Sequence, residues 1–137
     1  MYTNLDECRY IKDMPINWGD MDAFKHVNNV MYFKYFESAR ISYLETLDYS
    51  RIARELNISV ILASINAKYI SPLFYPDLIR VGIDITEVKA DRFTMNYILF
   101  STTQNKVAAV GSSVIVTYDY KENKKIEIPE DLRLKLL

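Results

Sequence analysis

The residues best suited to chemistry in this chain lie close together, between positions 20 and 29. They comprise two carboxylates, the only histidine of the chain and two asparagines: Asp20, Asp22, His26, Asn28 and Asn29. At neutral pH a carboxylate can act as a nucleophile or as a general base, and a histidine can accept or donate a proton. The cluster therefore predicts a site for nucleophilic or acid–base chemistry.

A long helical pattern follows this cluster directly. Its apolar residues recur at helical spacing on one broad face, made of Tyr32, Phe33, Phe36, Ala39, Tyr43, Leu44 and Leu47. Asn28 or Asn29 can cap the start of the helix with a side-chain oxygen. Free N–H groups and the helix dipole make that end suited to developing negative charge. Further along, Arg40 stands three residues after Glu37, a spacing that predicts an ion pair at the helix margin.

The rest of the chain has mainly strand patterns. Alternating residues predict strands at 10–18, 59–69, 79–86 and 93–99, and a continuous apolar run predicts a further strand at 107–118. Short helices are predicted at 50–56 and after Pro129. The later strands are joined by hairpin-length turns, which indicates an antiparallel sheet. We therefore expect an α+β fold in which an antiparallel β-sheet wraps around one long central α-helix, in a single domain spanning residues 1–137.

The strand expected at 107–118 also bears on assembly, because it is apolar on both faces. Its outer face should meet protein, and association of two copies would bury it. We therefore expect a homodimer, or a homotetramer built from dimers.

Composition narrows the class of protein. The 137 residues (16.1 kDa) are 50% hydrophobic and 26% charged with a net charge of −1, which gives no reason to expect a nucleic-acid or membrane partner. Cys8 is the only cysteine, so no internal disulfide can form. The chain start does not have the pattern of a signal peptide and no apolar run is long enough to span a bilayer, so we expect a cytoplasmic protein. We expect no cofactor and no metal, since the calcium-loop pattern fails at Phe24 and Lys25.

Residues 18–40 resemble the hotdog-fold thioesterases. The resemblance is carried by Trp18-Gly19-Asp20-Met21-Asp22-Ala23-Phe24-Lys25-His26-Val27-Asn28-Asn29 and by the following Tyr32, Tyr35, Phe36, Glu37, Ala39 and Arg40. The group most resembled is the 4-hydroxybenzoyl-CoA thioesterase-like family of acyl-CoA thioesterases, and the order of elements extends the similarity over nearly the whole chain. The resemblance implies the hotdog fold, hydrolysis of an acyl-CoA to free acid and CoA, and no cofactor.

The resemblance also implies roles for particular residues. Asp22 matches the catalytic carboxylate of the family, acting as nucleophile or as general base. The position of Asn29 matches the backbone N–H that polarises the thioester carbonyl. Acyl-ACP thioesterases carry an asparagine two residues before the histidine, where this chain has Phe24, and this difference favours the acyl-CoA branch. We expect the catalytic residues to be Asp22, His26 and Asn29, and the substrate-binding residues to be Asn28, Tyr32 and Phe24.

Structural alternatives remain open for each of these residues. Asp22 can serve only to cap or solvate its turn, His26 can be structural, and Asn28 and Asn29 can act as helix caps alone. Asp20 is expected to position Asp22 through loop hydrogen bonds. Two alternative functions also stay open: an acyl-ACP thioesterase, which would need a basic docking patch, and a non-catalytic acyl-CoA-binding hotdog protein.

Overall fold

Helix α1 (Asn29–Thr46) is the long helix predicted from the apolar periodicity. In the computed structural model, which describes residues 4–137, Asn28 is its N-cap, and the Val30 backbone N–H donates to the Asn28 side-chain oxygen at 3.1 Å. The helix buries Tyr32, Tyr35, Phe36, Ala39, Tyr43 and Leu44. Tyr35 was not part of the predicted apolar face, yet it is buried as well. Phe33 and Leu47, at the edges of that face, are half-buried.

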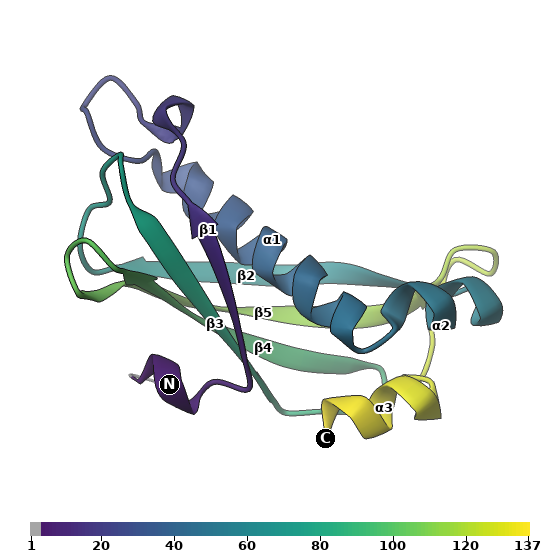
Figure 1. The fold of residues 1–137 in the computed structure, drawn as a ribbon. Coiled ribbons are helices and arrows are strands. Elements are labelled where there is room, and N and C mark those ends of the chain that lie inside the picture. The colour runs from purple at the N-terminus through teal and green to yellow at the C-terminus, as the bar shows by residue number, and fades with distance from the viewer. Residues whose placement is uncertain (1–3) are drawn as a thin grey trace.

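The sheet lies against this buried face of α1 (Figure 1). Its strands are β1 (Tyr10–Pro15), β2 (Ser59–Tyr69), β3 (Leu78–Thr86), β4 (Arg92–Ser101), β5 (Lys106–Asp119) and the short β6 (Lys124–Lys125). The main strands pair antiparallel in the order β1-β3-β4-β5-β2, and β6 adds to β5. The expected α+β architecture, with an antiparallel sheet around one long helix, is therefore confirmed. Pro15 lies in an edge strand, where its missing N–H costs no ladder bond.

Helix and sheet are in close contact at Phe36. The Phe36 ring is fully buried and stacks on the Tyr97 ring of β4, with 4.6 Å between centroids and 12° between planes. Gly111 of β5 lies beneath it: a Cβ there would stand 2.8 Å from the Phe36 ring and 2.4 Å from the Asn66 carbonyl oxygen. The absence of a side chain at position 111 therefore sets how close the helix can approach the sheet.

The outer face of the sheet differs from expectation. The alternation at 79–86 predicts a half-buried strand, yet Gly82 and Asp84 on the outward side of β3 are buried as well. The N-terminal segment causes this, because Leu5 of the 3₁₀ helix η1 (Leu5–Glu7) packs with Ile98 and Val110, and Arg9 Nε donates to Asp84 Oδ1 at 2.9 Å. The prediction that another copy covers the outer face of 107–118 is thus wrong at Val110, which the chain covers itself.

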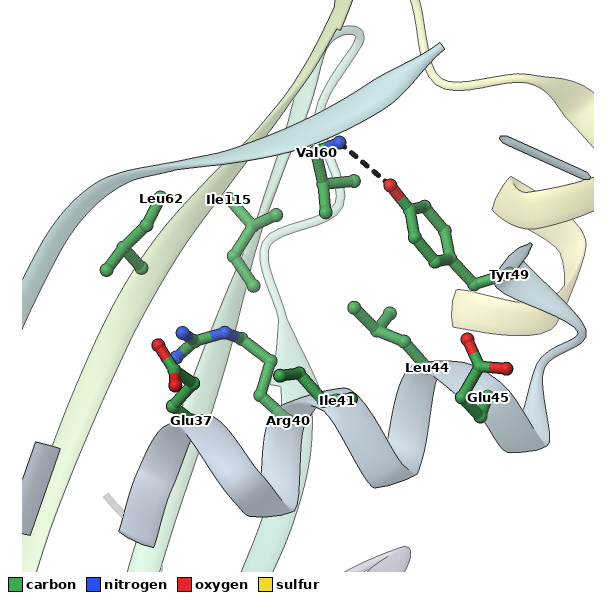
Figure 2. Close-up of a pocket in the computed structure, with 9 residues that line it drawn as sticks. All are labelled: Glu37, Arg40, Ile41, Leu44, Glu45, Tyr49, Val60, Leu62 and Ile115. Carbon is green, nitrogen blue, oxygen red and sulfur yellow. Dashed lines mark hydrogen bonds between the residues drawn. The ribbon is translucent and has the colours of Figure 1, made fainter. Parts of the chain in front are cut away.

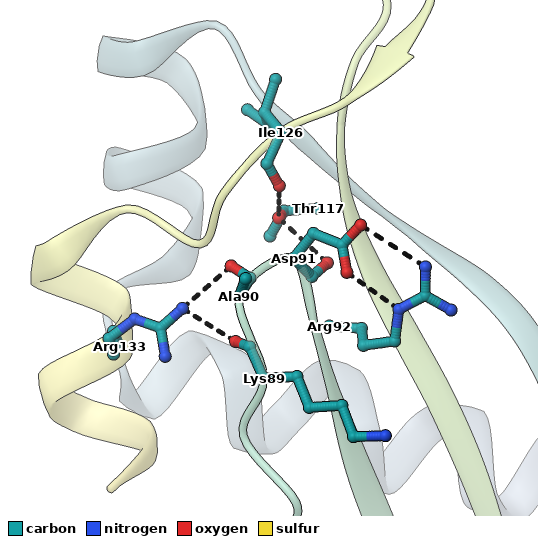
Figure 3. Close-up of polar contacts among 7 residues, drawn as sticks. All are labelled: Lys89, Ala90, Asp91, Arg92, Thr117, Ile126 and Arg133. Atoms are coloured by element: carbon teal, nitrogen blue, oxygen red, sulfur yellow. Dashed lines mark hydrogen bonds and ion pairs between the residues drawn. The ribbon is translucent and has the colours of Figure 1, made fainter.

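Two short helices lie at one end of the sheet, α2 (Tyr49–Leu56) and α3 (Glu130–Leu136) (Figure 1). Helix α3 buries Leu132 and Leu136, and its Arg133 side chain donates to the Lys89 and Ala90 carbonyls at 2.8 and 2.9 Å (Figure 3). These bonds tie the end of the chain to the turn between β3 and β4. Within residues 4–137, no helix has both the length and the apolar character required to cross a membrane.

Gly111→Ala should destabilise the protein by about 3 kcal/mol, because the new methyl group overlaps backbone as well as a buried ring. Urea unfolding followed by circular dichroism measures the change. Gly19→Ala is the matched control, since a Cβ at position 19 meets no atom within 4 Å, and it should change stability by less than about 0.5 kcal/mol. Equal stability of the two variants would contradict the close approach at Gly111.

Candidate active site

Asp20 is fixed in the loop that leads into α1. It ends the 3₁₀ helix η2 (Trp18–Asp20), and its Oδ2 accepts from the Asn17 backbone N–H at 3.0 Å and from the Tyr35 hydroxyl at 2.8 Å. Burial, and then the neighbouring Asp20 carboxylate, raise the pKa of Tyr35 far above its usual range, so the phenol remains a protonated donor. The Asp20 carbonyl also accepts from the Asn28 N–H at 3.0 Å, so Asp20 holds the loop against the start of the helix.

The following loop, residues 21–27, closes on itself. Met21 and Val27 form an antiparallel bridge, and the Asp22 N–H donates to the His26 carbonyl at 2.9 Å. Lys25 adopts a left-handed backbone conformation, with φ 67°, that completes the turn. The loop brings Asp22 Oδ2 to 3.9 Å from His26 Nδ1. Asp22 Oδ1 accepts from the Phe24 N–H at 2.8 Å, which leaves Oδ2 as the oxygen available for chemistry.

One backbone donor remains free at the start of α1. The Val30 N–H is taken by the Asn28 side chain, and the Met31 N–H donates to the Asn28 carbonyl at 2.9 Å. The Asn29 N–H has no acceptor within the described residues 4–137. A free N–H on the first turn of an eighteen-residue helix is well suited to bind a developing oxyanion.

A cavity of about 210 Å³ opens beside this donor. At the β2 end of the cavity wall, Tyr69 is held against the helix: its hydroxyl donates to the Asn29 carbonyl at 3.1 Å, and its ring packs on Tyr32 in a T-shaped arrangement with 4.8 Å between ring centroids. Its lining consists of His26, Val27, Asn29, Tyr32, Tyr69, Ile70, Ser71 and Pro72. The structure thus brings together His26, Asn29 and Tyr32 in one cavity, with Asp22 next to His26.

Two predicted substrate-binding residues lie outside this lining. Asn28 uses its side chain to cap α1. Phe24 is 81% exposed, and its ring lies roughly parallel to that of His26 with 6.3 Å between centroids. The presence of Tyr69 and Ser71 in this cavity could not be predicted from local patterns, because their position depends on how β2 pairs within the sheet. Their only local signal was the break of the strand pattern at Ser71–Pro72.

A second cavity, of about 300 Å³, lies between α1 and β2 further along the helix (Figure 2). Arg40 lines it and donates from Nη1 to the Tyr97 hydroxyl at 3.1 Å, and that hydroxyl also hydrogen-bonds to Ser113 at 2.6 Å. The predicted Glu37–Arg40 ion pair is therefore wrong. The guanidinium reaches across to the sheet, a partner that spacing along the helix cannot reveal.

Cys8 takes no part in the loop-and-helix site. It packs in the cluster of Leu5, Ile98 and Val110 on the outer face of the sheet. Burial, followed by the charges of Asp84 and Glu7, raises the pKa of its thiol to about 11, so the thiol is neutral at pH 7.

Comparison with known proteins defines the class. Residues 16–136 match the profile of the thioesterase-like superfamily, and the chain therefore belongs to that superfamily. The fold is that of the hotdog thioesterase structures: a 1,4-dihydroxy-2-naphthoyl-CoA thioesterase from Synechocystis superposes with a TM-score of 0.84 at 18% identity, covering 93% of this chain and 94% of that one.

Two bacterial relatives are named as acyl-CoA thioesterases. The chain is 26% identical over 116 residues to the long-chain acyl-CoA thioesterase FadM of Escherichia coli, covering 85% of this chain and 88% of the relative. It is 25% identical over 126 residues to the acyl-CoA thioesterase YbgC of Haemophilus influenzae, covering 86% and 87%. The chain is thus an acyl-CoA thioesterase-like hotdog protein.

Tyr35→Phe should lower the free energy of unfolding by about 1–2 kcal/mol, because it leaves the half-buried Asp20 carboxylate without its phenol donor. Urea unfolding at pH 7 provides the measurement. Tyr120→Phe removes the same atom from a side chain that is 61% exposed, and it should have almost no effect. If the two variants lose equal stability, the Tyr35–Asp20 bond does not support the loop.

Proposed function

We propose that this chain hydrolyses acyl-CoA thioesters at the start of α1, with Asp22 as the catalytic carboxylate. The observation that carries the proposal is that Asn29, whose N–H has no acceptor within the described residues, lines a cavity together with His26, and that the Asp22 carboxylate lies 3.9 Å from the His26 ring. Thioester hydrolysis requires both elements: a donor for the carbonyl oxygen and a carboxylate near the carbonyl carbon. The thioesterase names of the relatives support the same chemistry.

Asp22 can act by two routes. Its Oδ2 can attack the carbonyl carbon, expel the CoA thiolate and form a mixed anhydride, which water then cleaves to free acid and carboxylate. Alternatively Oδ2 takes a proton from a water that attacks the same carbon, and the proton passes to the departing thiolate. Either route uses the oxygen that the Phe24 N–H does not engage.

The Asn29 N–H would stabilise the negative charge that develops on the carbonyl oxygen in both routes. Removing one such preorganised donor typically costs about 100- to 1000-fold in turnover. His26 lies in the cavity wall, where its Nδ1 is 3.2 Å from the Val27 carbonyl oxygen and 3.9 Å from Asp22. With its Nδ1–H directed between the Val27 carbonyl oxygen and Asp22 Oδ2, His26 would orient Asp22 and contact the substrate. Tyr32 would form the apolar wall for the acyl group.

We also propose that two copies associate through the edge of β2. The other edge strand, β1, is short and carries Lys12, Asp13 and Pro15, features that discourage pairing. Strand β2 has eleven residues, and Leu62 and Tyr69 are 40% and 43% exposed along it. The cavity of about 210 Å³ is also smaller than the 300 Å³ or more usual for ligand sites, and a second copy at the Tyr69 end of β2 would extend its wall.

Light scattering at micromolar concentration should therefore give twice the 16.1 kDa chain mass, or four times for a pair of dimers. Ala63→Lys places a charge on the exposed edge of β2 and should shift the protein toward monomer without changing its circular dichroism. Thr103→Lys adds the same charge in an exposed turn elsewhere and should leave the mass unchanged. A monomeric wild-type protein would contradict the proposed interface.

Asp22→Asn should lower kcat for acyl-CoA hydrolysis by about 100-fold or more, because the amide keeps the size but cannot attack or accept the proton. Thiol release from a panel of aliphatic and aromatic acyl-CoAs gives the rate. Asp20→Asn is the paired control and should cost about tenfold, since it acts only through the geometry of the loop. Wild-type rates in Asp22→Asn would remove the mechanism proposed for this site.

A further inference from the structure

We propose that Gln104, in the turn between β4 and β5, is a positioning residue for the candidate active site. The inference rests on the proposed function. Both ends of the Gln104 carboxamide are engaged: Oε1 accepts from the Ser71 hydroxyl at 2.8 Å, and Nε2 donates to the Pro72 carbonyl at 2.8 Å. Ser71 and Pro72 form one wall of the cavity beside Asn29.

The turn that carries Gln104 is itself held in place by hydrogen bonds to buried groups. The Gln104 N–H donates to Ser101 Oγ at 3.1 Å, and that hydroxyl donates to the buried Asp77 carboxylate, which also accepts from the Thr103 N–H at 3.1 Å. Asn105 closes the turn in the left-handed conformation, with φ 54°. The Gln104 side chain therefore extends from a fixed turn onto a segment that has no regular secondary structure.

Residues 70–73 connect the sheet with the loop of residues 21–27, which carries Asp22 and His26. The Ile70 and Ser71 N–H groups both donate to the Ala108 carbonyl of β5, at 2.8 and 3.0 Å. Two residues further on, the carbonyl of the fully buried Leu73 accepts from the N–H of Val27 at 2.8 Å. Val27 follows His26 directly in the loop. Residues 70–73 thus link the sheet to the loop of Asp22 and His26, and Gln104 holds the middle of that link.

Without Gln104, the nearly buried Ser71 hydroxyl and the Pro72 carbonyl would lose their partners and the wall could shift. Gln104 lies behind this wall and would act on the reaction only through its position. A displacement of about 1 Å in a reacting geometry can cost about 100-fold in rate. Loss of the Gln104 contacts should therefore reduce kcat more than it reduces stability.

Gln104→Leu tests this directly, because leucine is similar in size and can neither accept from Ser71 nor donate to Pro72. We expect kcat for acyl-CoA hydrolysis to fall by about tenfold or more at a temperature where the variant is folded. Thr102→Val is the matched control: it removes a hydroxyl of the same turn that donates to the Leu78 carbonyl at 2.6 Å and lies 3.5 Å from Asp77, and it touches neither Ser71 nor Pro72. Its kcat should stay within about twofold of wild type.

Gln104→Glu provides a second variant with a pH signature. An ionised glutamate can accept from Ser71 but cannot donate to the Pro72 carbonyl, whereas the protonated acid can do both. The ordinary glutamate pKa is about 4.3, and a neighbouring carbonyl oxygen in a partly buried site raises it. The ratio of variant to wild-type kcat should therefore rise as the pH falls toward 5, and taking the ratio cancels the pH dependence that the two proteins share.

The proposal is overturned if Gln104→Leu keeps the wild-type kcat, if its loss only equals that of Thr102→Val, or if the Gln104→Glu ratio is independent of pH. Hydrogen exchange of the Val27 N–H supplies a readout that needs no catalysis, and this exchange should be faster in Gln104→Leu than in wild type. Wild-type activity in Asp22→Asn would overturn the proposed function alone, because the Val27 exchange still reports whether Gln104 holds the wall.

Discussion

The burial of α1 against the sheet is the constraint on which the rest of the structure depends. Phe36 can lie flat on Tyr97 only because Gly111 beneath it has no side chain, and this contact fixes the helix against the sheet. Once the helix is fixed, the position of its first turn is fixed as well. The free Asn29 N–H then has a defined direction and cannot adjust to each ligand, which is the condition for electrostatic stabilisation of a transition state.

The loop in front of the helix depends on contacts from outside its own sequence. Tyr35, on the helix itself, supports Asp20 from one side, while Leu73 receives the Val27 N–H from the other. Asp22 lies between these two attachments, on a loop closed by the Met21–Val27 bridge. The carboxylate thus gains its position from contacts that the rest of the fold supplies.

Local signals in the sequence predicted most of the elements, although the strand expected at 10–18 ends at Pro15 and Trp18 begins a 3₁₀ helix. Periodicity located α1, strand patterns located the main strands, and Asn28 was identified as a possible helix cap from its side chain. Contacts between distant residues could not be predicted, because they depend on strand register: Arg40 binds Tyr97, 57 residues away, where spacing along the helix favoured Glu37. The covering of the outer face by Leu5 was missed for the same reason. The roles of Asp22, His26 and Asn29 stay predictions.

The central claim is that the start of α1 polarises a thioester carbonyl in front of Asp22. Infrared difference spectroscopy on the Asp22→Asn variant, with an acyl-CoA labelled with ¹³C at its carbonyl, tests this most directly, since the bound thioester is observed before it reacts. If the Asn29 N–H donates to the carbonyl oxygen, the carbonyl stretch should move to lower frequency than in the same thioester free in water. A bound acyl-CoA whose carbonyl stretch stays at the free frequency, or rises above it, would contradict the claim.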